Sequence, residues 1–80
     1  TAWALDINNR GQIVGNSMLS NGMVHAFIFA GGTMTDLNSF LPPGSGWQLI
    51  NASAINDNGQ ITGWGMINGE EHSFLMTPIP

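Results

Sequence analysis

Two histidines are the side chains of this chain best suited to metal or acid–base chemistry. His25 and His72 can each bind a metal ion or exchange a proton near neutral pH. They stand at equivalent positions in two copies of a repeated segment, and no cysteine or carboxylate lies beside both. Because a repeated residue first serves a repeated structural need, we interpret each as an imidazole hydrogen-bonded across strands, and we predict no metal site.

The segment that begins at Asp6 is similar to the first half of a calcium loop in the spacing of its oxygen-bearing residues. Arg10, however, puts a cation at a ligand position, and Ala54 stands at the first ligand position of the second copy. We therefore expect an ordinary turn in which Asn8, and Asn56 in the second copy, bonds nearby backbone amides.

No set of residues in the sequence has the spacing of a catalytic centre. Serine, histidine and aspartate all occur, but without the Gly-x-Ser-x-Gly pattern of a nucleophile elbow. Glu70 and Glu71 are expected in a solvated turn, which does not suggest the paired carboxylates of a glycosidase. We predict no catalytic residues, no cofactor and no enzymatic activity.

The tryptophans are the best case for a binding site. Aromatic faces can stack on sugar rings, and neighbouring Asn and Gln side chains can hydrogen-bond the hydroxyl groups. Trp64 follows the repeated motif, and its equivalent in the first copy is Asn16. The ligand-binding candidates are Trp64, Trp47, Asn16 and Gln48. The alternative is that the indoles of these residues and of Trp3 pack between sheets with their N–H groups satisfied.

A near-duplication of the sequence shows which elements must position these residues. The segment Ile7–Gly15 returns as Ile55–Gly63, a shift of 48 positions (55 − 7), and His25–Phe29 returns as His72–Met76, a shift of 47 (72 − 25). A period of this length is typical of repeat proteins in which each unit is one supersecondary block. A single residue is therefore missing between the two matched segments of the second copy.

Strand patterns dominate both copies, and glycine interrupts nearly every window that could form a helix. Asn-Gly pairs at 21–22 and 68–69 match the two-residue hairpin turn, which needs positive φ at both positions. The expected strands are residues 2–7, 12–19, 24–30, 33–38, 47–56, 60–67 and 72–77.

The predicted fold is all-β, with antiparallel β-meander repeats that form two units similar to propeller blades. The first unit covers residues 1–41 and has a clipped first strand, a Pro/Gly-rich connection covers 42–46, and the second unit covers 47–80 and lacks its fourth strand. The strand at 24–30 is apolar on both faces, as in a strand sandwiched between two sheets. We expect self-association, or neighbouring repeats of a longer chain, to cover the outer faces.

Composition restricts the partners. One basic residue stands against five acidic ones, so a nucleic-acid backbone is not an expected partner. No apolar run reaches the length of a membrane span, so we predict no membrane insertion, and we expect no signal peptide within this chain. A chain of 80 residues without cysteine forms one small domain with a marginal core, which again favours association.

The order of these motifs resembles a known family. Ile-Asn-x-x-Gly-Gln-Ile-x-Gly, then His-Ala-Phe-Ile-Phe, then Gly-x-Met-Thr-Asp-Leu, resembles the HAF repeat of bacterial proteins, whose triplet is present here as His25-Ala26-Phe27. The segment from His72 to Pro78 resembles the family's C-terminal repeat, with Ser73 in place of alanine. The resemblance implies a multi-repeat, propeller-like β architecture and an extracellular or cell-surface location. It implies no particular activity or ligand.

Two functions follow as expectations. The first is a structural or interaction module of an extracellular β-repeat protein that forms a homo-oligomer or stacks on neighbouring repeats. The alternative is a carbohydrate-binding, lectin-like oligomeric propeller that binds a glycan at aromatic sites between units.

Overall fold

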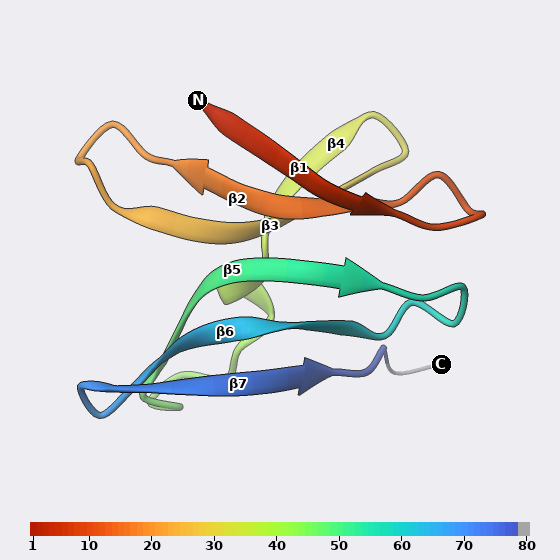
Figure 1. Ribbon diagram of the computed structural model, residues 1–80. Coiled ribbons are helices and arrows are strands. Elements are labelled where there is room, and N and C mark those ends of the chain that lie inside the picture. Colours follow the sequence, from red (N-terminus) through yellow and green to blue (C-terminus); the bar gives the residue numbers. More distant parts are fainter. Residues whose placement is uncertain (79–80) are drawn as a thin grey trace.

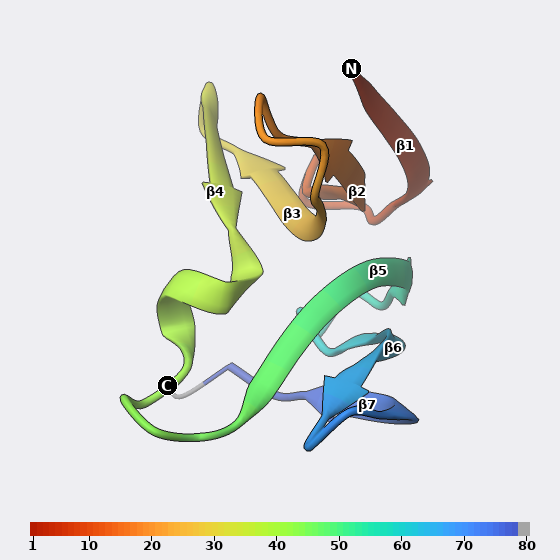
Figure 2. The same cartoon turned by 90° about the vertical axis from the view of Figure 1, so that its left-hand side faces the viewer.

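The chain folds into two antiparallel β-sheets that lie one over the other (Figures 1 and 2). This computed structural model describes residues 1–78. The elements are β1 (Ala2–Ile7), β2 (Ile13–Met18), β3 (Val24–Ala30), β4 (Thr33–Asp36), the 3-10 helix η1 (Leu37–Phe40), β5 (Trp47–Ile55), β6 (Ile61–Ile67) and β7 (Glu70–Met76). Strands β1 to β4 form the first sheet and β5 to β7 the second, each in chain order. The predicted all-β fold of antiparallel meanders is confirmed, and residues 79 and 80 of the predicted second unit lie outside the described residues.

The strand predicted for residues 33–38 ends at Asp36, and η1 follows it. The Asp36 carboxylate accepts hydrogen bonds from the backbone and side-chain amides of Asn38, at 2.8 and 2.9 Å. An Asp side chain that bonds the amide two residues further on favours a turn over an extended strand. The turn directs Leu37 into the core, where it is buried.

The expectation that Glu70 and Glu71 form a turn is wrong, because these residues begin β7. Glu70 pairs with Ile67, so the reversal consists of Asn68 and Gly69 alone, with φ of 51° and 80°. Two positive φ angles are what a two-residue hairpin turn requires, and this turn lets the strands pair immediately on either side.

The matching hairpin between β2 and β3 has a wider turn. The backbone N–H of Leu19 donates to the Met23 carbonyl at 2.7 Å, which leaves Ser20, Asn21 and Gly22 in the reversal. Gly22 has a φ of 84°, but Asn21 is not among the positive-φ residues of the described chain, so the prediction of a two-residue turn here is wrong. The additional turn residue accounts for the change in repeat shift from 48 to 47.

The β1–β2 and β5–β6 hairpins use the same asparagine turn. The Asn8 Oδ1 accepts hydrogen bonds from the backbone N–H groups of Arg10 and Gln12, both at 3.0 Å, and its Nδ2 donates to Gln12 Oε1 at 2.7 Å. Asn56 makes the same three bonds in the second copy. The predicted Asx-type turn is therefore confirmed in both units, and the oxygen that would have served calcium already accepts backbone amides.

The glycine that ends the shared motif is required by a close backbone approach. A Cβ atom added at Gly15 would overlap the carbonyl oxygen of Trp3, and one added at Gly63 would overlap that of Asn51. Both glycines lie inside strands, opposite a partner strand whose register shifts at a bulge. Glycine in a strand interior often marks such a bulge or close approach.

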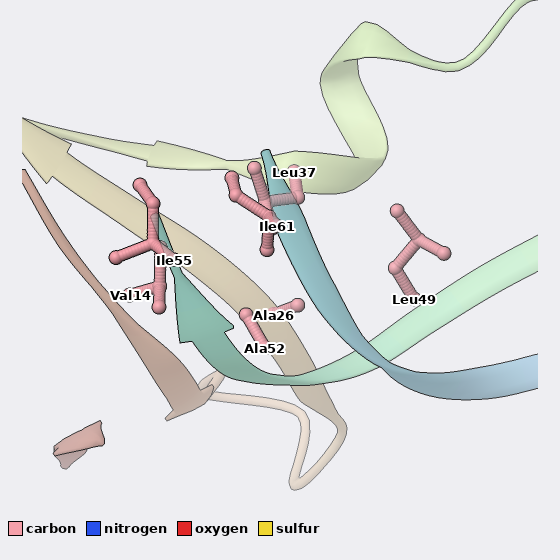
Figure 3. Close-up of a cluster of buried hydrophobic side chains, with 7 residues drawn as sticks. All are labelled: Val14, Ala26, Leu37, Leu49, Ala52, Ile55 and Ile61. Atoms are coloured by element: carbon pink, nitrogen blue, oxygen red, sulfur yellow. The ribbon is translucent and has the colours of Figure 1, made fainter. Parts of the chain in front are cut away.

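The core lies between the two sheets (Figure 3). Strand β5 contributes every third residue to it, Leu49, Ala52 and Ile55. A regular strand alternates its faces with a period of two, so this spacing needs an irregularity. The register shifts between Leu49 and Asn51 and between Ala52 and Ala54. These bulges turn the next residue back toward the first sheet, and β5 thereby crosses β1, β2 and β3 (Figure 2). The cluster is completed by Val14, Ala26, Leu37 and Ile61.

Hydrogen bonds between the β1–β2 turn and the β5–β6 turn join the sheets at one end. The Asn8 Nδ2 donates to the Asn56 carbonyl at 3.0 Å. Asn9 donates through its backbone N and its Nδ2 to the two carboxylate oxygens of Asp57, both at 2.8 Å. We call these three bonds the turn clasp. Because Asn8 is only 9% exposed, its amide is shielded from water that could replace these partners.

Three further polar contacts cross between the sheets along β5. The backbone N–H of Ile55 donates to Asp6 Oδ2 at 2.8 Å, and Asn16 Nδ2 donates to Asn51 Oδ1 at 2.6 Å. The Asn38 side chain, at η1, bonds both the carbonyl and the N–H of Leu49, at 2.9 and 2.7 Å. These contacts fix the position of β5 along the first sheet, while the core determines which face of the second sheet is buried.

We predict that Gly15→Ala and Gly63→Ala each destabilise the protein by about 3 kcal/mol or more, because the added methyl group overlaps a carbonyl oxygen that cannot move without breaking the strand pairing. Gly22→Ala is the control, since a Cβ there has no atom within 4 Å and suffers only from its φ of 84°. That strain costs roughly 1–2 kcal/mol. Urea unfolding measures all three, and equal losses would show that the close approach is not what requires glycine.

Asn8→Ala and Asn56→Ala form a matched pair. Both remove the asparagine turn, but only Asn8→Ala also removes the side-chain bond to the facing sheet. We expect Asn8→Ala to lower the free energy of unfolding by about 1 kcal/mol more than Asn56→Ala, which is the worth of one further hydrogen bond. Chemical denaturation at neutral pH gives both values, and a larger loss for Asn56→Ala contradicts the role assigned to the clasp.

Candidate functional site

The structure separates the four ligand-binding candidates into two pairs. Asn16 and Trp47 face the space between the sheets, where Asn16 bonds Asn51 and Trp47 packs against the core. Trp64 and Gln48 lie on the opposite face of the second sheet. Trp64 stands between Gly63 and Gly65, which pair with the core residues Ala52 and Leu49, and Gln48 directly precedes Leu49, so alternation turns both side chains away from the core. The four side chains therefore do not surround one hollow.

Trp47 serves packing. Its ring lies edge-on to His72 and to Phe74, with centroid distances of 6.3 and 6.5 Å and interplanar angles of 75°. These T-shaped contacts are the preferred arrangement of aromatic pairs. Beside them is an apolar recess of about 320 Å³ that also includes Leu41 and Leu49. The alternative that an indole packs between the sheets is thus the one that describes Trp47.

Trp64 and Trp3 remain available at the surface, with 37% and 47% of their area exposed. Trp64 pairs with Asn51 on one side and Ser73 on the other. The Asn51 amide already bonds Asn16 and Ser53, so an indole beside the Ser73 hydroxyl is what the carbohydrate alternative can use.

A larger hollow of about 520 Å³ opens between the sheets beside the turn clasp. Ile28, Leu37 and Ile61 form its apolar floor, and Phe40 and Arg10 stand at its walls. Arg10 is the one basic residue of the sequence. The sequence carries no signal for this hollow, because its lining residues come from both sheets, η1 and the end of β7, which are far apart along the chain.

His25 makes the cross-strand hydrogen bond predicted for it. Its Nδ1 lies 2.6 Å from Asp36 Oδ2, and Asp36 in turn holds Asn38, which bonds Leu49. Partial burial works to raise the pKa of the Asp36 carboxyl, but the hydrogen bonds from His25 and Asn38 outweigh it and hold that pKa below its ordinary value of 3.8. His72, the equivalent residue, contacts Trp47 edge-on instead.

Two kinds of feature do not occur among the described residues. Over residues 1–78, no three His, Cys, Asp or Glu side chains gather where they could hold an ion. No helix in the same span has the length and apolar character to cross a membrane.

Both sheets expose large apolar side chains on the side away from the core, and the second sheet carries hydroxyl groups beside them. In the first sheet, cross-strand pairing joins Ile7, Ile13, Phe29 and Met34 into one row across all four strands, which we call the first outer face. Ile7 is 59% exposed, Met34 46% and Phe29 38%. In the second sheet, the residues facing away are Thr62, Trp64, Ser73 and Leu75, the second outer face, where Leu75 is 64% exposed. Figure 2 shows no other element over either surface.

Comparison of the chain with protein-family models, with curated proteins and with solved structures finds no match.

The lowered pKa of Asp36 has a consequence for acid stability. A carboxylate whose pKa is lower in the folded state contributes stability above its unfolded pKa and loses it as the pH falls through the folded value. We therefore expect the native protein to lose stability below about pH 4. Asp36→Asn is expected to be less stable at neutral pH but to lose less between pH 5 and pH 2. Urea unfolding across this range checks it, and parallel pH profiles for the two proteins would disprove the role of this contact.

Proposed function

We propose that the chain is a structural or interaction module of an extracellular, HAF-type β-repeat protein, in which further sheets complete a propeller-like stack. The observation that carries the proposal is the exposure of large apolar side chains on both outer faces, Ile7, Phe29 and Met34 on the first and Trp64 and Leu75 on the second. A monomeric protein rarely exposes a contiguous apolar surface of this kind unless a partner covers it. The repeated motifs support the extracellular and propeller-like part of the proposal, because they resemble those of the HAF repeat.

The polar contacts between the sheets favour a scaffold over a catalyst. Four polar side chains form hydrogen bonds with the facing sheet or its turns, namely those of Asp6, Asn8, Asn16 and Asn38. Their contribution is to set the distance and register of neighbouring sheets, which is what a repeat array requires.

Association of this kind predicts that stability depends on protein concentration. A partner that binds the folded state alone stabilises it by mass action, so the thermal midpoint rises with concentration. We expect a rise of several degrees over a hundredfold increase in protein. Differential scanning calorimetry checks it. A constant midpoint, together with a particle of 8.5 kDa at every concentration, would overturn the proposal.

Carbohydrate binding is the second candidate, and the exposure of Trp64 between Asn51 and Ser73 favours it. A glycan array followed by titration tests it. If the indole stacks on a sugar, Trp64→Ala reduces affinity at least tenfold, while Trp47→Phe, which preserves the aromatic packing, leaves affinity unchanged. Absence of glycan binding by the native protein would remove this candidate and leave the module proposal intact.

A further inference from the structure

The first outer face repeats a row that the second sheet buries. Under the repeat shifts, Ile7, Ile13 and Phe29 are the counterparts of Ile55, Ile61 and Met76. In the second sheet this row packs into the core, with Ile55 6% and Ile61 4% exposed. In the first sheet the same positions are more open, since Ile7 is 59% and Phe29 38% exposed and Ile13 is partly exposed. One surface of the repeat unit is thus covered in one copy and open in the other.

The second outer face repeats the surface that covers the buried row. The buried row packs against Val14 and Ile28 of the first sheet. Their counterparts, Thr62 and Leu75, pair with each other just as Val14 and Ile28 do. Threonine has nearly the shape of valine, and leucine keeps the apolar character of isoleucine. The second sheet therefore presents outward the kind of surface on which a copy of the row already packs.

Two exposed tryptophans mark the point where such surfaces would meet. Within the chain, Asn16 of the first sheet contacts Asn51 of the second at 2.6 Å. The counterpart of Asn16 is Trp64, and the counterpart of Asn51 is Trp3. The strand pairing is equivalent in the two sheets, because Trp3 pairs with Asn16 in the first sheet and Asn51 pairs with Trp64 in the second. Where the facing sheet would belong to another chain, two tryptophans therefore stand in place of the two asparagines of the internal contact.

We propose that a second copy of this chain docks head-to-tail, with its second outer face on the first outer face and its Trp64 against Trp3. The arrangement repeats the internal sheet contact between chains. It rests on the proposed function, since it specifies how a self-associating module pairs. Because the two surfaces differ, the contact is heterologous, and successive copies close into a ring or extend into a filament.

The turn clasp can also repeat, but the hydrogen bonds from Asn16 to Asn51 and from Ile55 to Asp6 cannot. In residues 1–78, the Asn56 amide nitrogen bonds Gln60, while the equivalent amide of Asn8 also reaches across to the facing sheet. The Asn56 amide is thus placed to reach the Asn8 carbonyl of the second copy. Ala54 stands where Asp6 accepts the Ile55 amide, so that bond has no counterpart between chains. The contact between copies is therefore weaker than the internal one.

The test uses one charged substitution on each face. Phe29→Glu disrupts the first outer face and Leu75→Glu the second, and both positions are exposed enough for the fold to accept a charge. Met23→Glu, at a 43% exposed position in the β2–β3 turn, is the matched control. Circular dichroism confirms that each variant is folded, and light scattering coupled to size exclusion gives the mass of each protein and of an equal mixture of Phe29→Glu with Leu75→Glu.

We expect the native protein and Met23→Glu to assemble and each face variant alone to be monomeric. The mixture should double in mass, because each variant retains the face that the other needs. If Leu75→Glu still assembles while Phe29→Glu does not, the first outer face pairs with itself and the inference is wrong. Assembly of both variants also refutes it. A monomeric native protein refutes this inference and the proposed function together.

Cysteine trapping makes a weak mixed dimer detectable, since the chain has no cysteine of its own. Phe29→Glu/Trp64→Cys mixed with Leu75→Glu/Trp3→Cys places the thiols where the two intact faces meet in the proposed contact, and the mixture should form a mixed disulfide under mild oxidation. The reverse placement, Phe29→Glu/Trp3→Cys with Leu75→Glu/Trp64→Cys, puts them on the disrupted faces and should not. Equal cross-linking of the two mixtures would contradict the head-to-tail pairing.

Discussion

The packing of two like sheets through opposite faces is the contact on which the rest of the structure depends. The row Ile55, Ile61 and Met76 faces the first sheet, whereas its counterpart Ile7, Ile13 and Phe29 faces away from the second. A symmetric pair of sheets would bury the same face of each and leave two copies of the other face outside. This arrangement leaves one face of each kind uncovered, and a further sheet can pack on either of them.

The motif that the two copies share supports this contact and the strand pairing within each sheet. Asn8 pins its own turn and reaches the carbonyl of the next one, while the glycine at the end of the motif admits a bulged neighbour. The bulges in β5 rotate Leu49, Ala52 and Ile55 onto one side. The asparagine thus ties one sheet to the next, and the glycine lets two strands of one sheet pair closely. The strongest sequence signal in the chain therefore has a structural role.

Local chemistry was predictable from the sequence, and long-range placement was not. The all-β fold, the asparagine turns and the hydrogen bond of His25 follow from residue type and alternation, which act over a few positions. The alternation rule assumes a period of two, so it misses the bulges of β5 and the turn that Asp36 caps. It also could not show that Asn16 lies between the sheets while the equivalent Trp64 lies on the outside of the second sheet, because that depends on which face each sheet buries.

The most direct measurement is an isotope-filtered nuclear Overhauser experiment on an equal mixture of labelled and unlabelled native chains, at a concentration where the protein is assembled. Stacking of like sheets through opposite faces predicts cross-peaks between the indole protons of Trp3 in one copy and Trp64 in another. Cross-peaks that join Trp3 to Trp3, or indoles that both stay open to solvent in the assembled state, would contradict it.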